Sequence, residues 1–260
     1  MDVDVMRTIS SFLIVVAALY AALCLLVFLF QRSFIYFPTG LADPGEGSVR
    51  TLQAEGEIQK VSVRPREGSE ALIYFGGNAE DVTRTLGPFS EAFPDAAIYM
   101  LHYRGYGGSS GRPAEQALHQ DADALFRMVR EEHARVTVVG RSLGSAVAVR
   151  LAAGEPVVRL VLVTPFDSIV NVAKSKFPFL PFGLLLRERF ESWRHAPEIH
   201  VPTTIVVAGD DEVIPRESSD ALFLAFPPGI AEMVIIPGTG HNTISASPDY
   251  MAAIRGGLQR

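Results

Sequence analysis

The chain begins with one long apolar segment. Residues 8–31 carry no charged side chain, and their hydrophobicity is continuous rather than periodic. A helix of this length is about 36 Å long at a rise of 1.5 Å per residue, which is enough to cross the hydrocarbon core of a bilayer. We therefore predict a single transmembrane anchor over residues 1–33.

A cleaved signal peptide is the alternative interpretation of this segment. Its apolar core would be about 7 to 15 residues long and would end at a small-x-small site. Here the run LLVFLF continues beyond every alanine, which favours a retained helix. Lipoprotein-type cleavage before Cys24 would need a small residue where Leu23 stands, so we expect Cys24 only to pack against lipid. Arg7 and Arg32 flank the segment on both sides and leave its orientation open.

Short apolar runs rich in β-branched and aromatic residues recur through the rest of the chain. They are near-continuously apolar, which is typical of strands buried on both faces of a parallel sheet. The runs begin at Ala71, Ala96, Arg135, Val157, Thr203 and Ala231. We expect each of them to form a strand of one sheet.

Longer stretches that suit helices separate these runs. Residues 114–132 place apolar side chains at helical spacing behind Pro113, a favourable residue for a first helical turn. The earlier stretch 37–57 is rich in Pro and Gly and is interpreted as a linker leading into the first strands. The alternation predicts an α/β fold in residues 34–260, with a mostly parallel sheet covered by helices on both faces. Ligands of such sheets bind beyond the carboxyl ends of the strands.

Composition and charge narrow the function classes. Twenty-three basic and 29 acidic side chains give a net charge of −6, and there is no basic run. A phosphate backbone would have no electrostatic partner, so nucleic-acid binding is not expected. The single cysteine cannot form an internal disulfide or a thiolate metal site, so we expect stability to come from burial.

The strongest chemical motif is GRSLG at residues 140–144. It follows the run RVTVVG directly and precedes SAVAVRLAAG, a small-residue segment that suits a helix. A strand-turn-helix setting is what the GxSxG nucleophile elbow requires, because the turn holds its serine in a strained conformation. The flanking glycines avoid collisions in that turn. We predict that Ser142 is a nucleophile.

A second match to the same pattern, GGSSG at residues 107–111, lacks this setting. About ten residues separate the preceding strand from the helix that starts near Pro113. No elbow can be that long, so we interpret Ser109 as part of a loop.

A serine nucleophile needs a base and an orienting acid. His241 lies between glycine-rich residues after the last predicted strand, whereas the other five histidines lie in strand ends, helices or connections and are expected to be surface or half-buried residues. Asp210 and Asp211 follow the strand that starts at Thr203, and either could be the acid. The order Ser, Asp, His is the one that α/β-hydrolases use.

On these motifs the chain resembles the α/β-hydrolase superfamily, and in particular membrane-anchored members with one N-terminal span, a group that includes protein depalmitoylases. The similar stretches are HYRGYGGSSGRPAEQALHQDADA, TPFDSIVNVAKSKFPFLPF and VPTTIVVAGDDEVIP, beside GRSLG and GTGHN. The family's acid commonly stands four residues before a proline. The resemblance therefore selects Asp211, ahead of Pro215, as the acid.

The same resemblance implies an oxyanion hole. One donor is the backbone N–H of Leu143, the residue after the nucleophile, and the other lies in the loop Phe75-Gly76-Gly77-Asn78. Relatives commonly carry His-Gly-Asn there, which places the second donor on Asn78 and gives Gly77 the close backbone approach to substrate. Gly76 replaces the usual histidine, and a backbone donor does not depend on that side chain.

An apolar, proline-broken segment near residues 165–200 stands where these folds carry a cap. It contains Phe177, Phe179, Phe182, Phe190 and Trp193, which together suggest an entrance for acyl chains supplied by the bilayer. For any single ring, packing against the domain is the alternative. We expect Phe166, Phe179 and Gly77 to contact substrate.

The resulting prediction is a membrane-bound serine hydrolase that cleaves a small-molecule or lipid-like ester or thioester and needs no cofactor or metal. A serine nucleophile argues against dehalogenase and epoxide-hydrolase chemistry, which uses a carboxylate. A serine peptidase or amidase on the same fold is one alternative. A catalytically silent, membrane-tethered binding module is the other.

Overall fold

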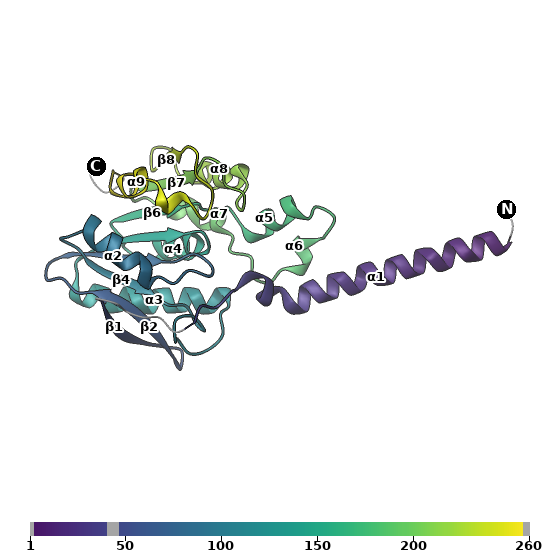
Figure 1. The fold of residues 1–260 in the computed structure, drawn as a ribbon, viewed down its shortest axis with the longest axis horizontal. Helices are drawn as coiled ribbons and strands as arrows, with labels where there is room; N and C mark the ends of the chain where they lie inside the picture. The colour runs from purple at the N-terminus through teal and green to yellow at the C-terminus, as the bar shows by residue number, and fades with distance from the viewer. Residues whose placement is uncertain (1–2, 41–46, 257–260) are drawn as a thin grey trace.

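The computed structural model describes residues 3–40 and 47–256 and consists of a sheet domain with one long helix projecting from it (Figure 1). That helix is α1 (Val3–Ile35), and the most apolar 18-residue stretch within Met6–Ile35 has a mean hydropathy of 3.0. By length and composition it could cross a membrane.

The described part of the domain contains one eight-stranded sheet in the order β1-β2-β4-β3-β5-β6-β7-β8. The strands are β1 (Ser48–Ala54), β2 (Glu57–Arg64), β3 (Glu70–Phe75), β4 (Ala97–Leu101), β5 (Arg135–Arg141), β6 (Arg159–Val163), β7 (Thr203–Ala208) and β8 (Ala231–Ile236). Only β1 and β2 run antiparallel to their neighbours. The other pairs are parallel, which confirms the predicted sheet and its six apolar runs.

The segment 37–57, predicted to be a linker leading into the first strands, already contains all of β1 and the first residue of β2 in its second half. Alternation of exposed and buried positions in β1 shows a strand with one face in solvent. Residues 41–46 of the predicted linker lie outside the described residues.

Two apolar layers cover the sheet, one on each face. Along β3, Ile73 belongs to the layer under α3 (Glu115–Glu132) and α4 (Leu143–Gly154), and Tyr74 belongs to the layer under α2 (Thr83–Ala92) and α9 (Asp249–Gly256). Successive strand side chains point to opposite faces, so a strand that is covered twice must be apolar throughout. The helix predicted behind Pro113 is α3.

The predicted cap lies between β6 and β7 and consists of short helices. These are α5 (Ile169–Lys176), α6 (Phe182–Leu185), α7 (Ser192–His195) and the 3-10 turn η1 (Ala196–Glu198). After β7 the chain forms α8 (Arg216–Ala225), β8, the 3-10 turn η2 (Ile244–Ala246) and α9. Helices α5 and α6 lie beside the domain end of α1 (Figure 1).

The contact between α4 and the centre of the sheet has no room for a side chain. A Cβ atom on Gly144 would collide with the carbonyl oxygen of Phe75 in β3, which is backbone and cannot rotate away.

We expect Gly144→Ala to destabilise the protein by about 3 kcal/mol, measured by denaturant unfolding. Gly154→Ala, in the same helix with open space around it, is the control and should leave stability within about 1 kcal/mol of the native value. Equal stability of the two variants would contradict this account of the contact.

Candidate active site

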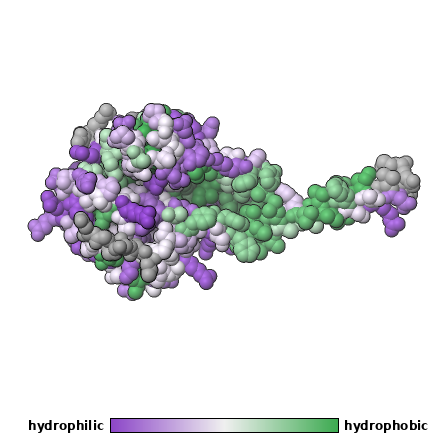
Figure 2. All heavy atoms as spheres, viewed as in Figure 1, coloured by the Kyte–Doolittle hydropathy of each residue, from purple (hydrophilic) through white to green (hydrophobic). Residues whose placement is uncertain are grey.

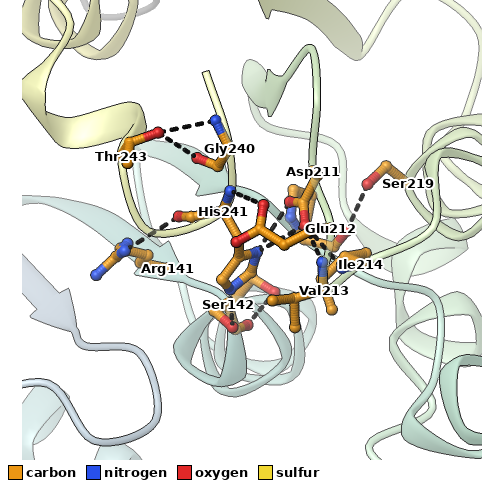
Figure 3. Close-up of polar contacts among 12 residues, drawn as sticks. Arg141, Ser142, Asp211, Glu212, Val213, Ile214, Ser219, Gly240, His241 and Thr243 are labelled. Carbon is orange, nitrogen blue, oxygen red and sulfur yellow. Dashed lines mark hydrogen bonds and ion pairs between the residues drawn. The ribbon is translucent and has the colours of Figure 1, made fainter. Parts of the chain in front are cut away.

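Three side chains meet beyond the carboxyl ends of β5, β7 and β8 (Figure 3). The Oγ atom of Ser142 lies 3.0 Å from Nε2 of His241. On the other side of the ring, Nδ1 of His241 lies 2.9 Å and 3.1 Å from the two carboxylate oxygens of Asp211. A hydroxyl, an imidazole and a carboxylate are thus joined in one hydrogen-bonded chain, although they are widely separated in sequence.

The turn at Ser142 has the backbone conformation that an elbow needs. Its φ of 50° and ψ of −116° are rare for a residue with a side chain, and such strain costs about 1–3 kcal/mol. Ser142 immediately precedes α4, so the N–H of Leu143 belongs to the first helical turn and has no intrahelical acceptor. The hydroxyl therefore stands beside a free N–H at the positive end of a helix.

Backbone donors fix Asp211 in place. Its Oδ1 accepts hydrogen bonds from the N–H groups of Val213 at 2.9 Å and Ile214 at 2.7 Å. Burial would raise the pKa of Asp211, but the hydrogen bonds from His241 and these N–H groups outweigh it and hold the pKa below its usual value. The neighbouring Asp210 is exposed, and its backbone N–H donates to Thr239. Of the two candidate acids, the structure brings Asp211 to the imidazole.

Two residues that the sequence analysis missed hold the backbone of His241. The carboxylate of Glu212 accepts a hydrogen bond from the His241 N–H at 3.0 Å, and Nη2 of Arg141 donates to the His241 carbonyl at 3.2 Å. Hydrogen bonds from its own N–H and that of His241 keep the pKa of Glu212 low. Both residues adjoin predicted site residues in sequence, which was the available signal.

The loop after β3 lies next to the serine. A Cβ atom on Gly77 would be 3.5 Å from the Ser142 Cβ, so the loop backbone closely approaches the reacting position. The Gly77 N–H already donates to Glu80 at 2.7 Å, which is consistent with Asn78 as the predicted second donor. Glu80 also accepts hydrogen bonds from the Tyr74 hydroxyl and from Nη1 of Arg141.

Glu80 therefore organises this loop, and sequence reasoning missed it. A Cβ atom at Gly76, in the same loop, would collide with Val82. The carboxylate of Glu80 bridges the loop and the residue before the nucleophile. Its partners lie up to 61 residues away, so no local pattern indicates its role.

The side chain of Asn78 joins the same loop to the end of α1. Its Nδ2 donates to the Ile35 carbonyl at 2.6 Å, and its Oδ1 accepts from the Phe37 N–H at 2.9 Å and from the Tyr106 hydroxyl at 2.8 Å. The chain that leaves the long helix is thus fixed directly against the predicted oxyanion loop.

Ser109 has a structural environment of its own. Its hydroxyl donates to the His102 carbonyl and accepts from the Lys60 N–H, both at 2.8 Å, so it links β2 to the loop after β4.

The expectation that the remaining histidines are surface or half-buried is wrong for His102 and His133, which are buried. His102 bonds to Ser62 and His133 to Tyr99, and burial lowers the pKa of His102 to about 4.

The aromatic residues of the cap divide into three groups. Phe166 and Phe190 are buried in the main core, where Phe190 packs edge-on against Tyr36. Phe177, Phe179 and Trp193 are more than 40% exposed. Phe182 is buried in a separate small cluster with Leu180 and Leu186. Phe166 and Phe190 therefore pack within the domain, whereas Phe177 and Phe179 remain accessible.

Among residues 3–40 and 47–256, no group of three or more His, Cys, Asp or Glu side chains is arranged to hold a metal ion.

Comparisons with known proteins agree with this architecture. The alpha/beta hydrolase family model matches residues 75–200. An uncharacterized protein of Mycobacterium tuberculosis is 30% identical over 243 residues, covering 88% of this chain and 86% of that protein. The alpha/beta hydrolase domain-containing protein aho-3 of Caenorhabditis elegans is 29% identical, covering 83% of this chain and 65% of that protein.

Among solved structures, the esterase Pf2001 of Pyrococcus furiosus superposes with a TM-score of 0.70 and 16% identity, covering 87% of this chain and 97% of that chain. The predicted α/β-hydrolase fold, with its mostly parallel sheet and long N-terminal apolar helix, is thereby confirmed. From the family match and the extent of the sequence similarity to the mycobacterial protein, the chain belongs to the alpha/beta hydrolase family.

Proposed function

We propose that this chain is a membrane-anchored serine hydrolase that cleaves carboxylic esters or thioesters. The observation that carries the proposal is the hydrogen-bonded chain from Ser142 through His241 to Asp211, with both links at about 3 Å. The structural likeness to an esterase supports the same reaction class.

In the proposed reaction, Ser142 Oγ attacks the substrate carbonyl carbon and its proton passes to His241 Nε2. The carbonyl oxygen becomes an oxyanion, which the N–H groups of Leu143 and Asn78 stabilise. The tetrahedral intermediate collapses, the ester C–O or thioester C–S bond breaks, and the leaving group takes the proton from His241. Water then attacks the acyl-enzyme with His241 as base, and the carboxylic acid leaves as Ser142 regains its proton.

In this scheme Asp211 orients the His241 ring and provides a negative charge beside it. Its carboxylate accepts from Nδ1, so the proton of the neutral ring lies on Nδ1 and Nε2 is free to accept from Ser142. The low pKa keeps the carboxylate ionised throughout the neutral range, where it stabilises the imidazolium that forms during attack.

We assign residues 1–33 to the anchor and 34–260 to the hydrolase domain with its cap near 165–200. A signal sequence would share the length and composition of α1. The contacts of α1 favour retention, because Tyr20 donates to the Phe179 carbonyl and Arg32 forms an ion pair with the buried Glu188. Cleavage would remove a helix that is part of the packed structure.

The test uses the full chain in detergent with a fluorophosphonate probe, butyryl esters, acyl thioesters and peptide amides. We expect covalent labelling at Ser142, mapped by mass spectrometry, together with hydrolysis of the esters or thioesters. A folded protein that is not labelled would be a binding module, and faster cleavage of amides than of esters would make it a peptidase. Either result would overturn the proposal.

A further inference from the structure

A groove of about 470 Å³ lies between α1 and the cap. One wall is the domain end of α1, with Leu23, Val27 and Phe34, and the other is formed by α5 and the segment that follows it, including Ala173 and Phe179. The volume is in the range of small-molecule sites. The hydrophobic surface of α1 continues onto the cap around it (Figure 2).

Polar contacts fix these two walls relative to each other. The Gln31 Oε1 accepts from the N–H groups of Arg187 and Glu188, and its Nε2 donates to the Leu185 carbonyl. The guanidinium of Arg187 stacks over the ring of Phe28, 4.4 Å from its centroid. The amide of Gln31, one of two polar side chains that line the groove, is thus already bonded.

Cys24 takes part in the same contact. It was predicted to face lipid, but it is half-buried and packs with Val27 against a small apolar cluster in the cap that contains Leu180, Phe182 and Leu186. The prediction was wrong because one stripe of α1 faces the protein, which a uniformly apolar sequence does not reveal.

The groove adjoins both loops of the candidate active site. Ile35 lines it, and the Ile35 carbonyl accepts from Asn78 of the predicted oxyanion loop. Lys176 also lines it, and its ammonium donates to the Glu212 carbonyl, next to Asp211, at 2.8 Å. Both walls are therefore hydrogen-bonded to loops of the candidate site, one carrying Asn78 and the other carrying Asp211 and Glu212.

The position of the cap along α1 places the groove at membrane depth. Tyr20 and Gln31 both bond to the cap, and eleven residues of helix span about 16 Å. The stretch of α1 from Tyr20 to Gln31 belongs to the apolar segment that would lie in the hydrocarbon core of the bilayer. The cap residues there are apolar and exposed, with Phe179 61% and Leu184 85% exposed. A soluble protein rarely exposes such a continuous apolar surface.

We propose that this groove is the binding site for the acyl chain of a long-chain ester or thioester that enters from the adjoining lipid leaflet, so that the membrane helix is itself a wall of the substrate site. The inference rests on the proposed hydrolase function. The groove would hold the hydrocarbon tail between α1 and α5, and the carbonyl carbon of the same substrate would lie at Ser142.

Chain-length kinetics of the full protein in nanodiscs test this inference. Val27→Trp fills the groove, and we expect kcat/KM for a palmitoyl ester to fall about tenfold or more. For the butyryl ester, which is too short to need the groove, kcat/KM should fall at least about fivefold less, and a native circular-dichroism spectrum shows that the variant is folded. Leu29→Trp adds the same bulk on the exposed side of α1 and should leave both substrates unchanged.

Equal losses for the two esters with Val27→Trp, or no loss for either, would overturn the acyl-chain site and leave the proposed hydrolase function intact. Absence of hydrolysis in the native protein would instead count against the hydrolase.

A second measurement does not depend on turnover. In Ser142→Ala, a fatty acid with a terminal diazirine should cross-link to the α5 segment, and Val27→Trp in that background should abolish the cross-link while Leu29→Trp retains it. Cross-links to α5 that persist with Val27→Trp, or none at α5 in the parent, would show that the groove does not hold the chain.

Discussion

Ser142→Ala is expected to lower kcat for ester hydrolysis by about a millionfold, to the level that binding and the oxyanion donors alone provide. The alanine keeps the strained turn but removes the hydroxyl that contacts His241 Nε2 and would form the acyl-enzyme. KM should change little, because the hydroxyl contributes to bond making rather than to binding the substrate. Initial rates with a butyryl ester, together with loss of fluorophosphonate labelling, provide the measurement.

The second GxSxG pentapeptide offers a matched control within the same chain. Ser109→Ala removes a hydroxyl that links His102 to Lys60, so unfolding free energy should fall by about 1–3 kcal/mol. The value of kcat should stay within about twofold of native, since the partners that the structure gives the Ser109 hydroxyl, Lys60 and His102, are not triad residues. A preparation in which Ser142→Ala keeps native activity would place the nucleophile elsewhere.

These two serines show what the sequence could and could not distinguish. The pentapeptide alone occurs twice, and the decisive difference is the spacing between strand and helix, which is visible in the sequence because both elements have strong local patterns. The structure places Ser142 directly between β5 and α4 and Ser109 in a loop. Strand-end positions of His241 and Asp211 were predictable for the same reason.

The supporting groups were not predictable, because their partners are remote. Glu80 bonds to Arg141 and Glu212 bonds to the backbone of His241, and such pairs exist only once the sheet has brought its strand ends together. The docking of α1 depends on Gln31 reaching the backbone of the cap 154 to 157 residues later. An apolar helix read from sequence alone gives no sign of that contact.

The start of the β1–β2 hairpin could not be predicted, for a different reason. Its strands are polar on one face and are bordered by Gly and Pro, so the composition of residues 37–57 resembles a linker more than a strand. Pairing with β4 buries the inner face and decides the outcome. The central strands had no such ambiguity, since burial on both faces makes them apolar throughout.

Asp211→Asn should lower kcat by about four orders of magnitude. The Val213 and Ile214 N–H groups require an acceptor at the Oδ1 position, so the asparagine oxygen will occupy it and the amide nitrogen will face His241 Nδ1. The ring must then accept at Nδ1 and carry its proton on Nε2, where it cannot take the proton of Ser142. The loss should appear in kcat with KM nearly unchanged.

Asp210→Asn is the matched control, because the residue is adjacent, exposed and isosteric with its variant. We expect its kcat to stay within about twofold of native. The comparison also decides between the two candidate acids that the sequence left open. If Asp210→Asn caused the larger loss, the imidazole would have to rotate away from Asp211 during turnover, and the hydrogen-bonded chain seen here would not be the reacting arrangement. Steady-state kinetics of both variants on one short-chain ester make this distinction directly.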